Sequence, residues 1–324
     1  MPGFLEILKM DNNYFSGEIP SSLQNCIGLE RLYLGGNKLS GSIPSWIANN
    51  QLLTLLQLRS NSLSGHIPDQ LCSLPSLRIL DLGHNIFSGT IPKCVNRLTN
   101  LVNRSSVRGW TYSDGDFEVT SVTTKGREIE YFSNKVWRFL NIIDLSSNEL
   151  EGEIPEEVSS LVQLDTFNLS MNHLKGKIPS RIGNLNLLKT LDLSHNQLSG
   201  HIPQSLSNMT FLSHLNLSHN KLTGRIPSGN QLQTLDDPSI YEGNSLCGFP
   251  LSKCPEDGDN THDPHVHEEK DHGDDEGKFG FYASMVLGFI IGFWSVCGTL
   301  ILKKSWRYAY FQFFDHLSED KTSV

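Results

Sequence analysis

Hydrophobic and polar positions recur with a fixed period along most of the chain. Leucines follow the order LxxLxLxxNxL, as in residues 29–39 and 188–198, and an Ile-Pro pair follows each time. Within each of two blocks these pairs are 24 residues apart, at Ile19, Ile43, Ile67 and Ile91, and then at Ile154, Ile178, Ile202 and Ile226. The alternating LxL segment predicts one short strand per unit, with its two leucines pointing inward.

A repeat of this length and pattern is the signature of a leucine-rich-repeat solenoid, in which each turn stacks on its neighbours. Every unit keeps an asparagine at one position, from Asn13 to Asn220, and we expect its amide to bond the backbone at a bend. Four residues later each unit has a glycine, where the chain turns tightly. The pattern predicts an α/β-type solenoid with one parallel sheet on its concave face, built from four repeats in residues 1–100 and four in residues 140–235.

The period is interrupted between the two blocks. Ile91 and Ile154 are 63 residues apart, 39 more than one period, which defines an insert at residues 101–139. The insert is rich in aromatic residues, including Trp110 and Tyr112, which argues against disorder, and its alternation over residues 117–123 predicts a short strand. Either it is a folded island that docks on the concave face and shapes a ligand surface, or it packs only for its own stability.

The cysteines indicate how the solenoid is closed. Residues 236–254 follow the last repeat, and Cys247 and Cys254 are close enough in sequence to clamp a terminal loop over the final leucines. Cys72 and Cys94 occupy nearly matching convex positions in adjacent repeats, so they either form a second disulfide or remain two small buried thiols. Cys26 is predicted to be a core residue. The first repeat has no such cap and no signal peptide precedes it, so either the true start lies upstream or the chain enters the membrane tail first.

Charge and hydropathy divide the C-terminal part of the chain. Of the net charge of −9, residues 255–278 carry −8, which predicts a solvated acidic spacer. No basic stripe is present, which argues against a nucleic-acid partner. Residues 279–302 contain no charged side chain and would span roughly 36 Å as a helix, enough to cross a hydrocarbon core of about 30 Å. Lys303, Lys304 and Arg307 follow, so residues 303–324 are expected to be a short cytoplasmic tail.

Two short motifs lie in and after the predicted membrane span. Ser284, Gly288 and Gly292 are small residues spaced four apart, which would allow close packing against another helix, although glycines are common in membrane helices. Tyr308 and Phe311 fit a Tyr-x-x-bulky endocytic signal, or they belong to an aromatic belt at the membrane surface.

The sequence predicts no enzyme, no cofactor and no metal site. Three carboxylates share one outward strand position, which we interpret as a solvent-exposed polar position because no histidine or nucleophile recurs beside them: Asp81, Asp144 and Asp192. Three histidines also share one repeat position, and stacked copies of one ligand type do not close a tetrahedral metal site: His84, His195 and His219.

Candidate surface chemistry is of two kinds. Glycosylation sequons occur at Asn103, Asn168, Asn208 and Asn216. The second and fourth are outward strand positions, so glycans there would shield the concave sheet in the sixth and eighth repeats. The first four repeats are unshielded, and their outward residues either form a ligand-binding surface or are an ordinary polar sheet face: Arg31, Tyr33, Gln57, Arg59 and Arg78.

Four phrases carry a resemblance to a known family: VTTKGREIEY, IDLSSNELEGEIP, YEGNSLCGFPL and LGFIIGFWSVCGTLILKKSWR. Together with the order of segments, they resemble the C-terminal portion of a plant leucine-rich-repeat receptor-like protein of the disease-resistance class, and the last phrase resembles the branch that recognises fungal xylanase-type elicitors. The chain departs from that family at its front, where a signal peptide, a paired-cysteine cap and further repeats are expected.

This resemblance implies a single-pass plasma-membrane glycoprotein with extracellular repeats. It would bind an extracellular protein or peptide and signal in plant defence and innate immunity through an associated leucine-rich-repeat receptor kinase adaptor and a co-receptor, because the family has no kinase of its own. Two alternatives remain open: a truncated, non-signalling remnant or decoy, and a receptor subunit for developmental peptides.

Overall fold

The computed structural model describes residues 4–103, 120–124, 127–131, 140–229 and 231–254. The chain divides into two compact units, residues 1–258 and 259–324, and every described residue lies in the first unit. The predicted acidic spacer, membrane span and cytoplasmic tail therefore lie outside the described residues. Among the helices of the described part, none has the length and apolar character that crossing a bilayer requires.

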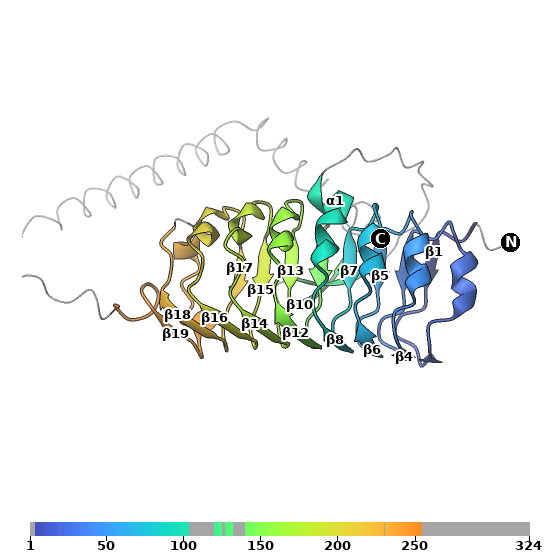
Figure 1. Ribbon diagram of the computed structural model, residues 1–324, viewed down its shortest axis with the longest axis horizontal. Coiled ribbons are helices and arrows are strands. Elements are labelled where there is room, and N and C mark those ends of the chain that lie inside the picture. The colour runs from blue at the N-terminus through green and yellow to red at the C-terminus, as the bar shows by residue number, and fades with distance from the viewer. Residues whose placement is uncertain (1–3, 104–119, 125–126, 132–139, 230, 255–324) are drawn as a thin grey trace, which may run out of the picture. The chain divides into compact units, whose positions relative to one another are not determined.

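One parallel sheet contains a strand from every repeat (Figure 1). Its eight strands, in spatial order, are β1 (Ile7–Lys9), β3 (Arg31–Tyr33), β5 (Leu55–Gln57), β7 (Ile79–Asp81), β11 (Ile142–Asp144), β13 (Thr166–Asn168), β15 (Thr190–Asp192) and β17 (His214–Asn216). Their central residues align across the sheet and point into the core, as the LxL pattern predicts. Strand β7 pairs directly with β11, so the two blocks of repeats continue one sheet across the insert.

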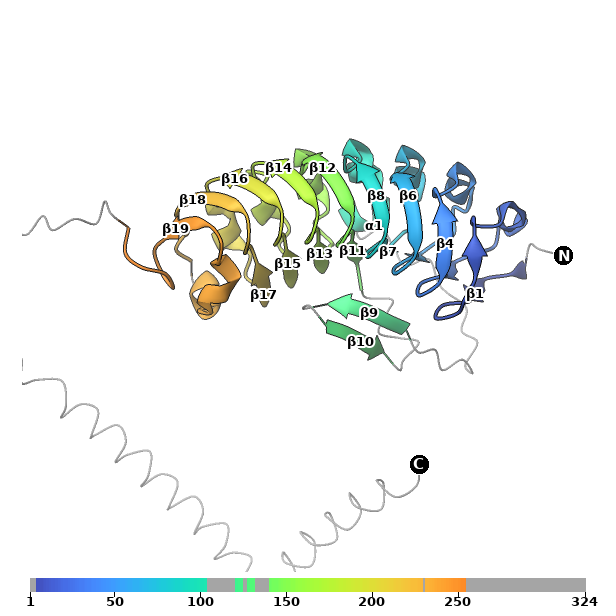
Figure 2. The ribbon, with the colours of Figure 1, turned by 90° about the horizontal axis from the view of Figure 1, so that it is seen from below.

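A second parallel sheet lies along the solenoid, and the expectation of a single sheet was therefore wrong (Figure 2). It contains β2 (Ser16–Gly17), β4 (Lys38–Gly41), β6 (Ser62–His66), β8 (Ile86–Gly89), β12 (Glu149–Glu153), β14 (His173–Gly176), β16 (Gln197–Gly200), β18 (Lys221–Arg225) and β19 (Ser245–Cys247). The segment after each of the eight repeat asparagines is itself extended and has a glycine at a φ of +76° to +88°. A leucine points inward from this segment in six repeats, and Phe87 does so in the fourth. Those φ values favour glycine over any other residue.

The convex side consists mainly of short 3₁₀ helices, which refines the α/β expectation. They are η2 (Ser21–Asn25), η3 (Ser45–Asn49), η4 (Asp69–Ser73), η5 (Lys93–Arg97), η7 (Glu156–Ser160), η8 (Ile182–Asn184) and η9 (Gln204–Asn208), with η10 (Leu232–Thr234) and η11 (Pro238–Tyr241) after the last repeat. Most follow an Ile-Pro pair directly, because the fixed φ of proline suits a helix start. The single described α-helix, α1 (Thr99–Val102), precedes the insert.

The repeated asparagine builds a buried ladder that joins consecutive turns. In the sixth repeat, Asn172 Nδ2 donates to the carbonyl oxygens of Leu145 at 3.0 Å, Leu169 at 3.1 Å and Ser170 at 3.2 Å. Its Oδ1 accepts the backbone N–H of Leu150 at 3.0 Å. Two of these partners belong to the preceding repeat, so one amide satisfies backbone groups on both sides of each stacking interface.

A ninth ladder asparagine, which the sequence analysis missed, lies in the C-terminal cap. Asn244 follows the eighth ladder asparagine by one 24-residue period, and its Nδ2 donates to the carbonyl oxygens of Leu217 at 2.9 Å and Tyr241 at 3.1 Å. A disulfide joins Cys247 to Cys254 across a separation of seven residues. The cap is therefore an incomplete ninth repeat closed by a disulfide.

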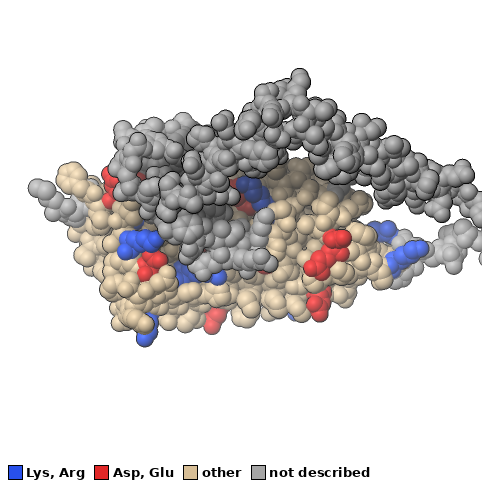
Figure 3. Space-filling view, turned by 180° about the vertical axis from the view of Figure 1, so that it is seen from behind, with Lys and Arg blue, Asp and Glu red and all other residues tan. Residues whose placement is uncertain are grey.

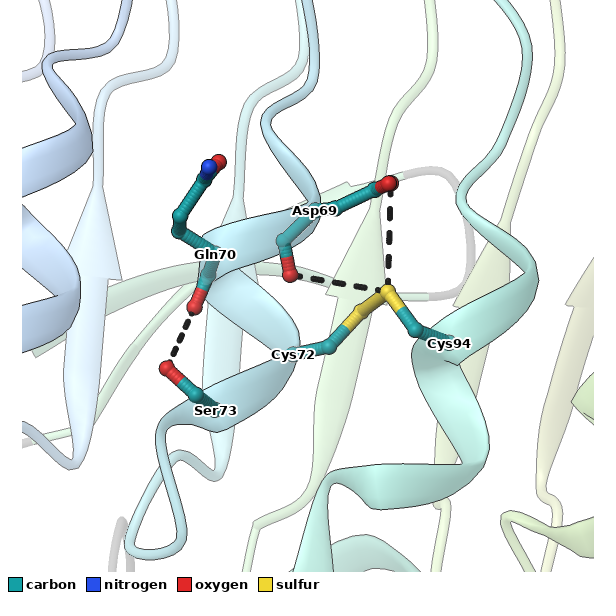
Figure 4. The surroundings of a disulfide bond; sticks show 5 residues. All are labelled: Asp69, Gln70, Cys72, Ser73 and Cys94. Carbon is teal, nitrogen blue, oxygen red and sulfur yellow. Dashed lines mark hydrogen bonds between the residues drawn. A yellow bond between two sulfur atoms is a disulfide. The ribbon is translucent and has the colours of Figure 1, made fainter.

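The second disulfide lies on the convex side between η4 and η5 (Figure 4). It joins Cys72 and Cys94, whose Cα atoms are 5.7 Å apart, and Cys94 Sγ lies 3.5 Å from the carbonyl oxygen of Asp69. Of the two alternatives that the sequence left open, the structure has the disulfide. Cys26 is a buried free thiol, as expected for a core residue.

The insert begins later than the period suggests. Leu101, in α1, is completely buried in the main core, where it takes the place of the first leucine of the fifth repeat. Leu140, to which the period assigns that place, instead packs against a separate cluster outside the core. Within the insert, β9 (Thr120–Thr124) and β10 (Arg127–Tyr131) form an antiparallel hairpin, and β9 overlaps the strand predicted over residues 117–123.

Candidate ligand-binding surface

Two columns of outward residues line the concave sheet. The first column, from the first to the eighth repeat, is Ile7, Arg31, Leu55, Ile79, Ile142, Thr166, Thr190 and His214, and the second is Lys9, Tyr33, Gln57, Asp81, Asp144, Asn168, Asp192 and Asn216. Figure 3 shows the molecule from the side of this sheet, with basic and acidic side chains interspersed. The columns contain both apolar and charged side chains, so neighbouring repeats present different chemistry.

Four outward residues form an apolar stripe across the second to fifth repeats. Tyr33, Leu55, Ile79 and Ile142 are each exposed by no more than 2%, although the alternation of the strands points them away from the core. Side chains on a free sheet face keep solvent contact, so such burial requires material packed over them. Tyr33, a candidate ligand-binding residue, is therefore buried inside this apolar stripe.

The other candidates in the first four repeats are only half-buried, and each has partners. Arg31, Gln57 and Arg78 are all engaged in interactions. One of them is a contact of 3.4 Å from Arg78 Nη1 to Asn141 Oδ1, which joins residues on either side of the insert. These side chains are thus positioned by the fold rather than free, which pre-orders the surface they belong to.

A charged cluster lies beside the apolar stripe. Arg59 Nη1 is 3.1 Å from Asp144 Oδ2 and 3.6 Å from Asp81 Oδ1. The two carboxylates face each other on the paired strands β7 and β11 and are only 1–2% exposed, so the interpretation of this position as solvent-exposed was wrong for both. Burial, and then the neighbouring Asp144, raise the pKa of Asp81 to about 7. Asp192, at the same position two repeats further on, is half-buried.

The sixth to eighth repeats present a polar surface. Each outward Asx residue accepts hydrogen bonds from the N–H and Oγ of a serine two residues later, as Asn168 does from Ser170 at 3.1 and 2.7 Å. Lys189 Nζ lies 2.7 Å from Asp165 Oδ1, in an ion pair between an exposed lysine and a buried carboxylate. Hydroxyl, amide and carboxylate groups therefore dominate this half of the face.

The sequons fall on two sides of the molecule. Asn168 and Asn216 lie on the concave strands β13 and β17 and are half-buried, whereas Asn103, after α1, and Asn208, at the end of η9, are exposed away from the concave sheet. Glycans on the first two would stand on the concave sheet, as the strand positions imply.

Nothing in the described residues suggests a metal site. Groups of three or more histidine, cysteine, aspartate or glutamate side chains arranged for a metal ion do not occur in that part of the chain. The repeated histidines adopt a left-handed backbone, with φ of 52° at His84 and His195 and 54° at His219. This backbone conformation is typical of a turn. The rings of His195 and His219 also stack, with their centroids 4.3 Å apart.

Several predicted site residues lie outside the described residues. They are Trp110 and Tyr112 in the insert, Ser284, Gly288 and Gly292 in the predicted span, and Tyr308 and Phe311 in the predicted tail.

A leucine-rich-repeat model covers residues 27–87, and a second one covers residues 4–26, 139–161, 163–185, 187–209 and 211–241. These matches span more than half of the chain, which therefore belongs to the leucine-rich-repeat proteins. The leucine-rich-repeat solenoid and the leucine-rich-repeat family expected from the sequence are confirmed.

Among curated proteins, the chain is similar to receptor-like protein EIX2 of Solanum lycopersicum, with 61% identity over 196 residues. That match covers 58% of this chain but 18% of the relative, so the chain spans less than a fifth of the length of this receptor-like protein.

Two solved structures show the same fold in plant receptors. The ectodomain of the Arabidopsis thaliana receptor kinase GASSHO1/SCHENGEN3, in complex with CASPARIAN STRIP INTEGRITY FACTOR 2, is 35% identical with a TM-score of 0.61, over 76% of this chain and 25% of that one. The Arabidopsis receptor kinase HAESA, in complex with the peptide hormone IDA and the co-receptor SERK1, is 35% identical with a TM-score of 0.51, over 76% and 38%.

Proposed function

We propose that this chain is part of a cell-surface receptor-like protein of plant defence. Its repeats lie outside the plasma membrane, residues 279–302 cross it, and residues 303–324 form the cytoplasmic tail. The repeats bind an extracellular elicitor, and signalling runs through an associated receptor kinase and a co-receptor. The 61% identity to a receptor-like protein and the uncharged 24-residue block support this assignment.

The observation that carries the ligand-binding role is the asymmetry of the concave face. Its second to fifth repeats bury the apolar stripe, whereas its sixth to eighth repeats present serine, amide and carboxylate groups. An apolar core beside polar groups is typical of protein interfaces. Here the apolar stripe would hold its cover in place, and the polar groups beside it would select the ligand.

In this proposal the insert is the cover of the apolar stripe. The chain enters the insert after Asn103 and leaves it at Leu140, which itself packs against the stripe. The remaining 36 residues, 104–139, are attached where the stripe ends and contribute Trp110 and Tyr112. The ligand would then contact the insert together with the half-buried Arg31 and Arg78 at its edge, rather than the stripe directly.

A binding experiment with the full chain tests this role. The chain, tagged at its C terminus and expressed in leaf cells, should retain a fluorescent fungal xylanase on washed microsomes. Replacing Trp110 and Tyr112 together with alanine should weaken retention at least tenfold, because aromatic anchors dominate interfaces. Phe211→Ala is the matched control, since Phe211 is 57% exposed and lies outside the concave strands.

The outcomes separate the alternatives. Equal loss in both variants would assign the effect to folding or to non-specific adhesion and would remove the insert from the site. Absence of xylanase binding at normal surface abundance would contradict elicitor recognition by these repeats and favour a non-signalling remnant or decoy.

A second candidate, a receptor subunit for small peptides, is favoured by the likeness to GASSHO1/SCHENGEN3 and to HAESA, which are solved with a peptide factor and a peptide hormone. Retention of a synthetic peptide library, competed by unlabelled peptide and not by xylanase, would support this role instead.

A further inference from the structure

We propose that Arg59, Asp81 and Asp144 form a proton-sensitive joint that holds the two blocks of repeats together at the base of the insert. Asp81 ends β7, the last concave strand before the insert, and Asp144 ends β11, the first one after it. Arg59 comes from the third repeat and reaches both carboxylates.

The reach of Arg59 is unusual in a solenoid, where contacts normally join neighbouring turns. Its partner Asp144 is two repeats away in space and 85 residues away in sequence. Gly83, at the corresponding position of the intervening repeat, makes this crossing possible. A Cβ atom on Gly83 would lie 2.5 Å from Arg59 Nη1 and 3.1 Å from Asp144 Oδ1, so any side chain there would displace the guanidinium group.

The cluster is unbalanced in charge when both carboxylates are ionised. Like charges directly opposite on paired strands destabilise a sheet, and one guanidinium offsets only one of them. Asp144 accepts the N–H of Ser146 at 2.9 Å and its Oγ at 2.6 Å on Oδ1, and Asn168 Nδ2 donates to its Oδ2 at 3.2 Å. Asp81 accepts one backbone N–H, from Gly83 at 3.2 Å. The single extra proton is therefore held by Asp81.

The groups that face Asp81 agree with this assignment. Gln57, on β5, donates a hydrogen bond to it, and Arg59 lowers its pKa, but burial and Asp144 outweigh both and raise that pKa to about 7. His84, after β7, also faces the cluster, and burial and Arg59 lower its pKa below the usual value, which disfavours its charged form. Near neutral pH the joint thus changes between a balanced and an unbalanced state.

The sign of the effect follows from linkage. Asp81 binds its proton more tightly in the closed joint, where its pKa is about 7, than in an opened one, where it approaches the ordinary 3.8. The stabilisation is complete below pH 3.8 and is lost as pH rises through 7. From pH 5 to pH 8 the equilibrium constant for opening should rise on the order of 100-fold.

Hydrogen exchange of the full chain in detergent micelles tests the joint. The reporters are the backbone amides of Leu82 and His84, which donate to the carbonyl oxygens of Asp144 and Ser146 across the two blocks. After correction for intrinsic exchange, their opening should rise about 100-fold between pH 5 and pH 8 in the wild-type chain. In Asp81→Asn, which keeps the shape and removes the titration, the rise should disappear.

Two further variants keep the test specific. Asp192→Asn changes the matching carboxylate two repeats beyond Asp144, and it should keep the wild-type rise. Arg59→Met removes the group that lowers the pKa of Asp81, so the midpoint of the rise should move to higher pH, a shift that loss of packing alone would not produce. A rise that persists in Asp81→Asn, or a midpoint unmoved by Arg59→Met, would overturn the proposal.

Discussion

The asparagine ladder allows a sharp test of how the repeats are held together. Replacing Asn172 with alanine removes one bond accepted from the N–H of Leu150 and three donated bonds. Four bonds at about 1 kcal/mol each would suggest a loss of about 4 kcal/mol. The carbonyl oxygens of Leu145 and Leu169, however, each keep a second amide donor, from Asn148 and Asn196.

Only the N–H of Leu150 is then left without its partner in a buried place. An orphaned buried donor costs about 1–3 kcal/mol, and the weakened carbonyl bonds add a smaller amount, so Asn172→Ala should cost about 2–3 kcal/mol. The matched control is Asn13→Ala in the first repeat. Asn13 is exposed, and its amide donates to the nearby carbonyl oxygens of Met10 and Asp11, so its loss should cost less than about 1 kcal/mol.

The double variant gives the decisive measurement. Asn172 and Asn196 are the two amide donors to the carbonyl oxygen of Leu169, so removing both orphans that oxygen, which neither single change does. The double variant should exceed the sum of the single ones by about 1–2 kcal/mol. Urea unfolding of the full chain, followed by tryptophan fluorescence, measures all four variants. Additive losses, or equal losses for Asn13→Ala and Asn172→Ala, would refute the ladder argument.

Three further predictions follow from the geometry. Changing Cys72 and Cys94 to serine should lower the free energy of unfolding by about 3 kcal/mol, and changing Cys247 and Cys254 to serine should lower it by about 2 kcal/mol. The first loss is larger because the first disulfide closes a loop of 22 residues and the second a loop of 7. Urea midpoints in the reverse order would contradict this chain-entropy argument. Phe167→Ala should lower the free energy of unfolding by about 3–5 kcal/mol, because Phe167 is 1% exposed, whereas Phe211→Ala should change it very little, because Phe211 is 57% exposed. Equal melting points for the two variants would refute this prediction. Glycosidase treatment of the natural protein should increase its gel mobility if the sequons face the secretory lumen, and an unchanged band would leave the proposed extracellular placement without support.

The regular part of the fold could be predicted because the 24-residue period determines which residues of adjacent repeats lie side by side and which side chains point inward. Once LxxLxLxxN repeats every 24 residues, the inward positions, the strand and the buried asparagine follow from packing and backbone hydrogen bonding. Asn244 could have been found by adding one more period to the eighth ladder asparagine. The second sheet could also have been found, because the residues after each asparagine alternate with a period of two.

The chemistry of the concave face could not be derived from single repeats. Tyr33 was assigned to the surface because its strand position faces outward, and only the packing over it shows that it is buried. The cluster of Arg59 and Asp144 depends on which strands become neighbours after the insert and on the absence of a side chain at Gly83. Such contacts depend on one particular residue two turns away, and the repeat pattern, which describes only what all repeats share, does not contain that information.

The insert interrupts the solenoid at a small cost in folding free energy. Lengthening a connection from 24 to 63 residues costs only about 1 kcal/mol in loop-closure entropy. Leu101 fills the core position of the fifth repeat, so the insert does not cost the core the roughly 1.5–3 kcal/mol that a buried leucine contributes. The Cys72–Cys94 disulfide staples the convex side just before the insert, and Arg59 bridges the concave side across it. With the core, the convex side and the concave side each secured, β7 and β11 pair in register across the insert.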